Sequence, residues 1–230
     1  MGYTKVGSKM SLLSEEQKKQ VKARLAQNLL NPVTLTVFTQ EYECDYCKEN
    51  RELAQDIASS SDKIKLEVLD LMKDSEKAKE LGVDKVPATV IGGSKGSRVR
   101  FYGVPAGYEF STFLTDIILV SRGETELSPE TRKALAGLKA PVHVQVFVTP
   151  TCPYCPGMVS LAHQFAMENP VIEADMVEVS EFPQLGVKYN VMGVPKTVIN
   201  ETIEFVGAQP EKEFLRQVQA AARPPKPTYA

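Results

Sequence analysis

The sequence contains two Cys-x-x-Cys motifs that are 108 positions apart, at Cys44–Cys47 and Cys152–Cys155. When residues 44–91 are laid over residues 152–199 without a gap, 13 of the 48 positions carry the same residue. Both segments end in Val-Pro-x-Thr-Val-Ile, and the second cysteine lies 40 residues before the proline in each. A repeat of about 100 residues has the length of a domain and is too long for a solenoid repeat. The chain of 230 residues is therefore predicted to fold into two related units.

Each copy predicts the same order of helices and strands. A helix comes first, because Ser14 opens a capping-box pattern and Ser128 precedes a proline at the first helical position. A strand rich in β-branched residues leads into the Cys-x-x-Cys motif, which opens a second helix. A strand, a short helix, two further strands and a last helix follow. The predicted strands cover 33–39, 64–71, 88–91 and a segment ending at 103 in the first copy, and 142–149, 171–179, 196–199 and a segment ending at 207 in the second.

This order indicates an α/β fold of two tandem units, each a mixed central sheet flanked by helices. We place the boundary beside Gly123, a residue suited to end a helix, which gives units 1–122 and 123–230. The tail at about 223–230 is rich in proline, and we expect it to be disordered.

Composition and charge argue against several classes of protein. A net charge of -2 offers no strong positive field for nucleic acid or an anionic membrane. Residues 1–10 contain no apolar segment of the kind found in signal peptides, and no apolar run approaches the ~18 residues that span a bilayer. We therefore expect a soluble cytoplasmic protein. In that compartment Cys-x-x-Cys pairs serve redox chemistry or bind metal more often than they act as structural staples.

A Cys-x-x-Cys motif between a strand and a helix suits thiol–disulfide exchange. The first cysteine is expected at the helix N-terminus, where unpaired N–H groups and the helix dipole favour a thiolate. That thiolate attacks a disulfide, and the second cysteine resolves the mixed disulfide. Cys44 and Cys152 are therefore the predicted nucleophiles, and Cys47 and Cys155 the predicted resolving residues.

Two other interpretations of the cysteines stay open. A shared four-cysteine zinc site usually has its pairs ~15–20 residues apart, whereas 104 residues separate Cys47 from Cys152. Alternatively, each pair could form an inert structural disulfide in a peptide-binding or scaffold module. We favour redox catalysis, and we expect no metal and no cofactor besides the redox-active disulfides.

The motifs resemble those of a known family. Cys152-Pro-Tyr-Cys155 is the glutaredoxin active-site sequence. The order of strand, Cys-x-x-Cys, helix and Val-Pro resembles the thioredoxin fold, in which this proline is cis. The duplicated arrangement is similar to that of the protein disulfide oxidoreductases, or glutaredoxin-like proteins, of hyperthermophilic archaea and bacteria. The resemblance extends along most of the chain.

This resemblance implies a cytoplasmic dithiol–disulfide oxidoreductase that reduces, forms or isomerises protein disulfides. Its partners would be protein thiols and disulfides, with a thioredoxin-reductase-like flavoprotein as electron donor. It also implies cis bonds before Pro87 and Pro195. The residues before them, Val86 and Val194, can offer their backbone N–H and C=O groups to a substrate strand, so these four residues are predicted to bind substrate.

The chain departs from these families at two places. Thioredoxins carry a buried acid six residues before the first cysteine, where this chain has Phe38 and Val146. Another group or water must then accept the proton of the resolving cysteine. Lys85 and Gly193 precede Val-Pro, where glutaredoxins usually have threonine, so we expect protein disulfides rather than glutathione as substrates.

The two sites are predicted to differ in redox properties. Glu41, Glu43 and Asp45 surround Cys44, whereas no acid lies near Cys152 in the sequence. Carboxylates disfavour a neighbouring thiolate, so Cys44 is predicted to have the higher thiol pKa. The N-terminal pair would then be the more reducing and the C-terminal pair the more oxidising. If solvent screens the acids, the two sites would instead be nearly equal.

Overall fold

The two halves of the chain form the same succession of elements, and the structure, a computed structural model, describes residues 12–223. The first half contains α1 (Glu15–Asn28), β1 (Val33–Thr39), α2 (Cys47–Ala58), β2 (Ile64–Asp70), α3 (Ser75–Glu80), β3 (Ala88–Gly93), β4 (Gly96–Tyr102) and α4 (Glu109–Arg122). The second half contains α5 (Pro129–Ala136), β5 (Val142–Val148), α6 (Cys155–Glu168), β6 (Ile172–Glu178), α7 (Pro183–Lys188), β7 (Lys196–Ile199), β8 (Ile203–Val206) and α8 (Glu211–Ala221).

Capping side chains and one glycine set the helix ends that the sequence indicates. The Gln17 N–H donates to the Ser14 side chain at 3.2 Å, and the Ser14 N–H donates to the Gln17 side chain at 2.9 Å. Ser128 accepts a hydrogen bond from the backbone of the first turn of α5. Gly123 ends α4 in the left-handed conformation, with φ of 67°. These local signals explain why the order of elements was predictable.

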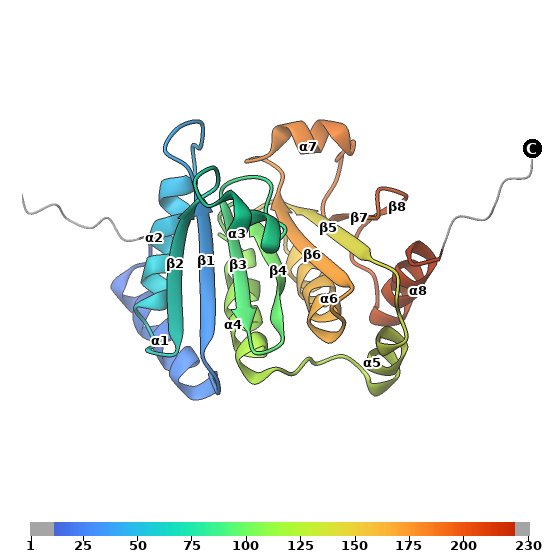
Figure 1. The fold of residues 1–230 in the computed structure, drawn as a ribbon, viewed down its shortest axis with the longest axis horizontal. Helices are drawn as coiled ribbons and strands as arrows, with labels where there is room; N and C mark the ends of the chain where they lie inside the picture. Colours follow the sequence, from blue (N-terminus) through green and yellow to red (C-terminus); the bar gives the residue numbers. More distant parts are fainter. Residues whose placement is uncertain (1–11, 224–230) are drawn as a thin grey trace, which may run out of the picture.

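The strands of the described residues form one 8-stranded sheet, in the order β2-β1-β3-β4-β6-β5-β7-β8. In each half the first strand pairs in parallel with the second and antiparallel with the third. The halves meet where β4 pairs in parallel with β6. Figure 1 shows α2, α4 and α6 behind this sheet and α3 in front of it. The predicted α/β fold with mixed sheets is confirmed, and the two units share a single sheet.

Buried polar contacts hold the halves together on both faces of this sheet. At the β4–β6 junction, Arg100 Nε donates to Asp175 Oδ1 at 2.6 Å, and Arg100 Nη2 donates to Glu173 Oε2 at 2.8 Å. Between α4 and α6, Asp116 Oδ2 lies 2.6 Å from His163 Nδ1, and both side chains are fully buried. One apolar core continues from α2 across to α6. The two units therefore form one packed body.

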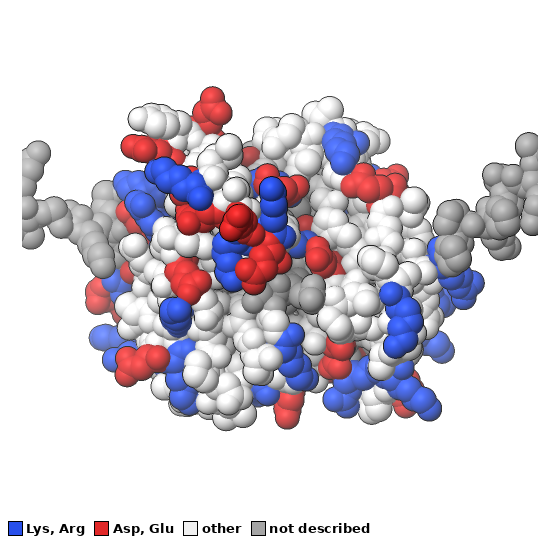
Figure 2. Space-filling model, in the orientation of Figure 1, with Lys and Arg blue, Asp and Glu red and all other residues white. Residues whose placement is uncertain are grey.

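Several expectations concern the surface or the ends of the chain. Residues 1–11 and 224–230, which include nearly all of the expected disordered tail, lie outside the described residues. None of the helices within 12–223 is long and apolar enough to cross a membrane. Figure 2 shows positive and negative side chains interspersed over one face, which fits the balanced charge of the sequence.

Candidate active sites

Each Cys-x-x-Cys pair forms a disulfide in the loop between a strand and a helix. Cys44–Cys47 lies between β1 and α2, and Cys152–Cys155 lies between β5 and α6. The second cysteine is the first residue of its helix, so the nucleophile lies just before the helix. Each pair is bonded within its own unit, so the four cysteines do not gather into one metal site. Within 12–223, no cluster of three or more metal-ligating side chains occurs.

The sulfur of Cys152 is placed where it can be stabilised as a thiolate. The backbone N–H of Cys155, at the start of α6, donates to Cys152 Sγ at 3.1 Å. This hydrogen bond and the positive end of the helix both favour negative charge on the sulfur. Cys152 is 7% exposed and Cys155 is fully buried. Cys152 is therefore the more accessible sulfur of the pair, and its role as nucleophile stays a prediction.

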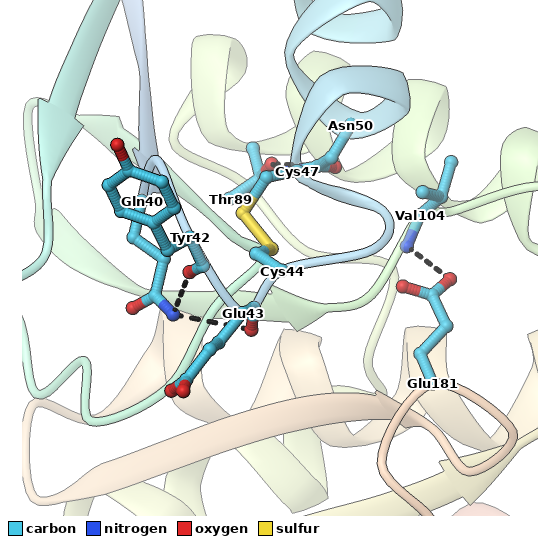
Figure 3. Close-up of a disulfide and its surroundings, with 9 residues drawn as sticks. All are labelled: Gln40, Tyr42, Glu43, Cys44, Cys47, Asn50, Thr89, Val104 and Glu181. Carbon is cyan, nitrogen blue, oxygen red and sulfur yellow. Dashed lines mark hydrogen bonds between the residues drawn. A yellow bond between two sulfur atoms is a disulfide. The ribbon is translucent and has the colours of Figure 1, made fainter.

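The N-terminal site is more open. Cys44 is half-buried, and its three flanking acids are exposed to solvent. The side chain of Gln40 donates to the carbonyls of Tyr42 and Glu43, at 2.6 and 3.2 Å, and so holds the loop that carries these acids (Figure 3). Among the described residues, the Cys44 sulfur has no counterpart of the hydrogen bond found at Cys152. This hydrogen bond is better grounds for a lower thiol pKa at Cys152 than the solvated acids are, and the order of the two pKa values stays a prediction.

The loops before the two motifs differ in length by one residue. Val37 pairs with Thr89 across β1 and β3, and Val146 pairs with Thr197 across β5 and β7. Val37 is therefore the equivalent of Val146, and the sequence comparison of Phe38 with Val146 is wrong by one position. Phe38 packs on the opposite face of the sheet. In both units the position carries valine, so the strand supplies no carboxyl group to the site.

Each unit has a cis peptide bond before the proline that precedes its third strand, Val86–Pro87 and Val194–Pro195, as predicted. Ala88 pairs with Phe38 near the end of β1, so Val86 lies at the sheet edge from which the Cys44 loop departs. Both valines are half-buried. Within 12–223, their backbone N–H and C=O groups have no hydrogen-bond partner. These groups are therefore available to an added strand.

Helices α4 and α6, one from each unit, run side by side in the same direction. Near their N-terminal ends, the Tyr108 N–H donates to the Pro150 carbonyl at 3.1 Å. Further along, Asp116 meets His163, and just beyond α4 the Glu126 N–H donates to Gln164 at 2.7 Å. The first turn of α4 therefore lies level with the first turn of α6.

Glu109 carries a buried carboxyl group in the first turn of α4, level with the first turn of α6. It lies seven residues, about two turns, before Asp116 and so beside the start of α6, where Cys155 lies. Its side chain is 2% exposed, and among the described residues only Thr112, one turn further along α4, offers its carboxyl group a weak hydrogen bond. Burial raises the pKa of Glu109 to about 7, and the charge of Asp116 adds to this effect, while the hydrogen bond from the Thr112 side chain opposes it. A buried acid with this pKa can exchange protons at neutral pH.

A cleft of about 560 Å³ between the units opens beside the N-terminal site. Tyr46 and Glu49 of that site line one side, and Pro150, which precedes the second motif, lines another. Much of the remaining wall is apolar, from Leu12, Leu13, Leu53, Val104, Pro105 and Phe110. The cleft therefore lies within reach of both Cys-x-x-Cys loops.

Glu181 of the second unit forms part of this cleft. The Val104 N–H donates to Glu181 Oε1 at 2.9 Å, and Figure 3 shows this contact near the Cys44–Cys47 disulfide. Burial raises the pKa of Glu181 to about 7, and the charges of Glu178 and Glu49 add to this effect, while the Val104 hydrogen bond opposes it. The cleft thus has an acidic wall in otherwise apolar surroundings.

The sequence did not point to either of these carboxyl groups. Glu109 stands at the start of a largely apolar helix, so an acid on its buried face was a signal that could have been used. Glu181 lies in a loop and carries no such signal. Both lie at the boundary between the units, and a comparison of the two repeats considers each unit alone.

Two thioredoxin-type units, each with a Cys-x-x-Cys disulfide between strand and helix and a cis Val-Pro at the same sheet edge, define the class of dithiol–disulfide oxidoreductases. The profile of the family described as "Thioredoxin domain" matches residues 33–115 and 142–220. The chain belongs to this family.

Known proteins place it further within the class. The crystal structure of a protein disulfide oxidoreductase from Aeropyrum pernix is 36% identical, with a TM-score of 0.85 over 94% of this chain and 97% of that chain. A structure of the alkylhydroperoxide reductase AhpF from Enterococcus faecalis is 26% identical, with a TM-score of 0.82 over 90% of this chain and 99% of that chain. A thioredoxin of Methanocaldococcus jannaschii is 40% identical over 75 residues, which are 32% of this chain and 87% of the relative. The chain spans 38% of the length of an alkyl hydroperoxide reductase component of Pseudomonas aeruginosa, to which it is 24% identical. The protein is thus a disulfide oxidoreductase of tandem thioredoxin-fold architecture, with two Cys-x-x-Cys sites that support thiol–disulfide exchange.

Proposed function

We propose that this protein reduces, forms or isomerises disulfides of other cytoplasmic proteins at both sites. In reduction, the thiolate of Cys44 or Cys152 attacks a substrate disulfide and releases one substrate thiol. The resolving residue, Cys47 or Cys155, then loses its proton and attacks the mixed disulfide, which releases the second substrate thiol. Two electrons pass to the substrate, and the enzyme pair becomes a disulfide. Oxidation of a substrate dithiol follows the same steps in reverse.

Substrate polypeptides are proposed to add a strand at Val86–Pro87 or Val194–Pro195. The support is the unpaired backbone of the two valines, because an extended segment can satisfy those groups with main-chain hydrogen bonds. Because such pairing contacts only the backbone of the substrate, substrates of many sequences can bind. The apolar cleft beside Tyr46 can hold side chains that flank the substrate cysteine at the N-terminal site.

Glu109 is proposed as the proton acceptor for Cys155. In each unit the strand position carries valine and supplies no acid, and the buried carboxyl of Glu109, level with the start of α6, can fill that need in the second unit. With its pKa raised by burial to about 7, Glu109 can take the Cys155 proton and later return it without leaving a permanent buried charge.

A thioredoxin-reductase-like flavoprotein is proposed to recharge the protein with electrons. The support is the similarity to chains of alkyl hydroperoxide reductase, whose name describes a reductase. The units are proposed to be 1–122 and 123–230, and no cofactor besides the two disulfides is proposed.

The observation that carries this proposal is that each redox disulfide lies at the same end of the sheet as a valine, Val86 or Val194, whose backbone N–H and C=O groups are unpaired among the described residues. Its test is the reduction of insulin by dithiothreitol, followed by turbidity, with wild-type protein and with a variant in which all four cysteines are serine. We expect acceleration by the wild type alone. Equal rates with both proteins would instead favour a binding module with inert disulfides. Variants with one pair replaced would show whether each site works alone.

A further inference from the structure

The two active sites differ in one pair of buried residues behind the resolving cysteine. In the N-terminal unit, Asn50 Nδ2 donates to Thr89 Oγ1 at 3.0 Å, and Thr89 Oγ1 lies 3.3 Å from Asn50 Oδ1. Asn50 is 1% exposed and Thr89 is fully buried. The repeat places Met158 at the position of Asn50 and Thr197 at that of Thr89. Within 12–223, the buried hydroxyl of Thr197 has no hydrogen-bond partner.

Strand and helix geometry place these residues against the cysteines. Thr89 is two residues after Pro87, on the sheet face that α2 covers, and Cys47 and Asn50 are neighbours one turn apart on α2. Figure 3 shows Thr89, Asn50 and Cys47 together. Thr197 has the same register against β5, and Cys155 and Met158 have the same spacing on α6. The free hydroxyl therefore lies behind Cys155.

A buried hydroxyl without a partner is costly, and it gains when an acceptor forms next to it. Reduction of the Cys152–Cys155 disulfide provides such an acceptor, because a thiol or thiolate sulfur accepts a hydrogen bond more strongly than the disulfide sulfur that leaves the Thr197 hydroxyl unpaired. In the N-terminal unit the corresponding hydroxyl already pairs with Asn50, so reduction of Cys47 brings no equal gain.

We propose that Thr197 donates a hydrogen bond to the reduced sulfur of Cys155. In the N-terminal unit, the hydroxyl of Thr89 stays hydrogen-bonded to Asn50 and does not donate to Cys47. The step rests on the proposed redox function: two electrons and two protons from a substrate dithiol convert the Cys152–Cys155 disulfide to two thiols, and the substrate becomes a disulfide. The hydrogen bond forms in the reduced state alone. It therefore makes the C-terminal pair easier to reduce, and hence more oxidising, than the N-terminal pair.

The test is the equilibrium of each pair with a dithiothreitol redox buffer, measured in full-length protein in which the other pair is serine. T197V removes the hydroxyl at nearly constant volume. It should shift the C-terminal equilibrium about tenfold toward the disulfide, which corresponds to a potential about 30 mV more negative. T197S keeps the hydroxyl and should retain the wild-type equilibrium. This rescue separates hydrogen bonding from a packing effect.

Asn50 and Met158 occupy equivalent positions, so each can be replaced by the residue that the other unit carries. N50M frees Thr89 and should shift the N-terminal equilibrium about tenfold toward the dithiol, whereas T89V in the wild-type background should change it little. Adding T89V to N50M should cancel the gain. M158N should move the C-terminal pair in the direction of T197V. If M158N fails to fold, T197V and N50M decide the outcome.

An unchanged C-terminal equilibrium in T197V, or an unchanged N-terminal equilibrium in N50M, would overturn the proposal. These equilibria are set with dithiothreitol and need no substrate protein. A failure of the insulin assay would therefore argue against the proposed function without deciding this inference, and the potentials decide the inference by themselves.

Discussion

Replacement of Glu109 by glutamine is expected to stabilise the folded protein and, at the same time, to slow thiol–disulfide exchange at the C-terminal site. The pKa of Glu109 rises from an ordinary value of 4.5 to about 7 because the carboxyl is buried. Between these pH values the unfolded chain releases a proton that the folded chain keeps, so stability falls as pH rises through this range. The difference corresponds to about 3 kcal/mol at pH 8. Glutamine has nearly the same shape and carries no charge, so E109Q should recover up to that amount at pH 8 and nothing at pH 4.

The catalytic cost should appear at the C-terminal site. Loss of a positioned proton acceptor typically slows a reaction about 100-fold, and here it should slow the release of substrate from the mixed disulfide with Cys152. Urea unfolding of the oxidised proteins at pH 4 and pH 8 measures the stability. Insulin reduction in a background with Cys44 and Cys47 replaced by serine measures the site alone.

E213Q is the matched control for E109Q. The hairpin of the last two strands is four residues shorter in the second copy, so Phe110 matches Phe214 and Glu109 matches Glu213 on α8. The Glu213 side chain, however, is 33% exposed and lies 3.2 Å from Arg216. We expect E213Q to leave both the free energy of unfolding and the rate of insulin reduction nearly unchanged. Equal gains of E109Q at both pH values, or full activity despite the expected gain in stability, would refute the reasoning.

Three further outcomes are expected. Redox titration of the two double Cys→Ser variants should give the more negative potential to the Cys44–Cys47 pair, and the opposite order would contradict the assignment. D175N should lose about 3 kcal/mol at pH 7, because it removes the buried one of the two carboxylates that neutralise Arg100 and leaves only the more exposed Glu173. Burial opposes ionisation of Asp175, but Arg100 and His143 lower its pKa, so the loss should shrink as pH falls toward that pKa, which urea titrations can follow. At the N-terminal site, the ratio of kcat/KM for a cysteine peptide carrying lysine to that for one carrying glutamate measures the effect of the acidic wall. E181Q should lower this ratio by up to about fivefold. An unchanged ratio would show that the acidic wall does not select substrates.

The repeat and its local signals predicted most of the fold. The capping pattern at Ser14, the glycine at 123 and the two Val-Pro motifs mark element ends through short-range chemistry, which a sequence displays directly. The one-residue error at Phe38 arose because a gapless alignment cannot show an extra loop residue before Cys44. A strand comparison based on alternation of buried faces would have shown it.

The contacts between the units were beyond the reach of the sequence. Pairing of β4 with β6 depends on which strand edges remain free once each unit has folded, and no local pattern states this. The position of Glu109 level with the start of α6 follows from that pairing, because the junction aligns α4 with α6. Asn50 and Thr89 were visible as residues, but their contact joins positions 39 residues apart.

The β4–β6 junction also determines what would happen if the units were separated. Cutting the chain between them would leave both strands with a full row of unpaired N–H and C=O groups, and β4 would expose the charge of Arg100 on the same edge. Open edges of this kind recruit other strands. A gene fragment encoding one unit should therefore yield a self-associating product, and fusion partners or tags are better attached at the chain ends than inserted at the junction.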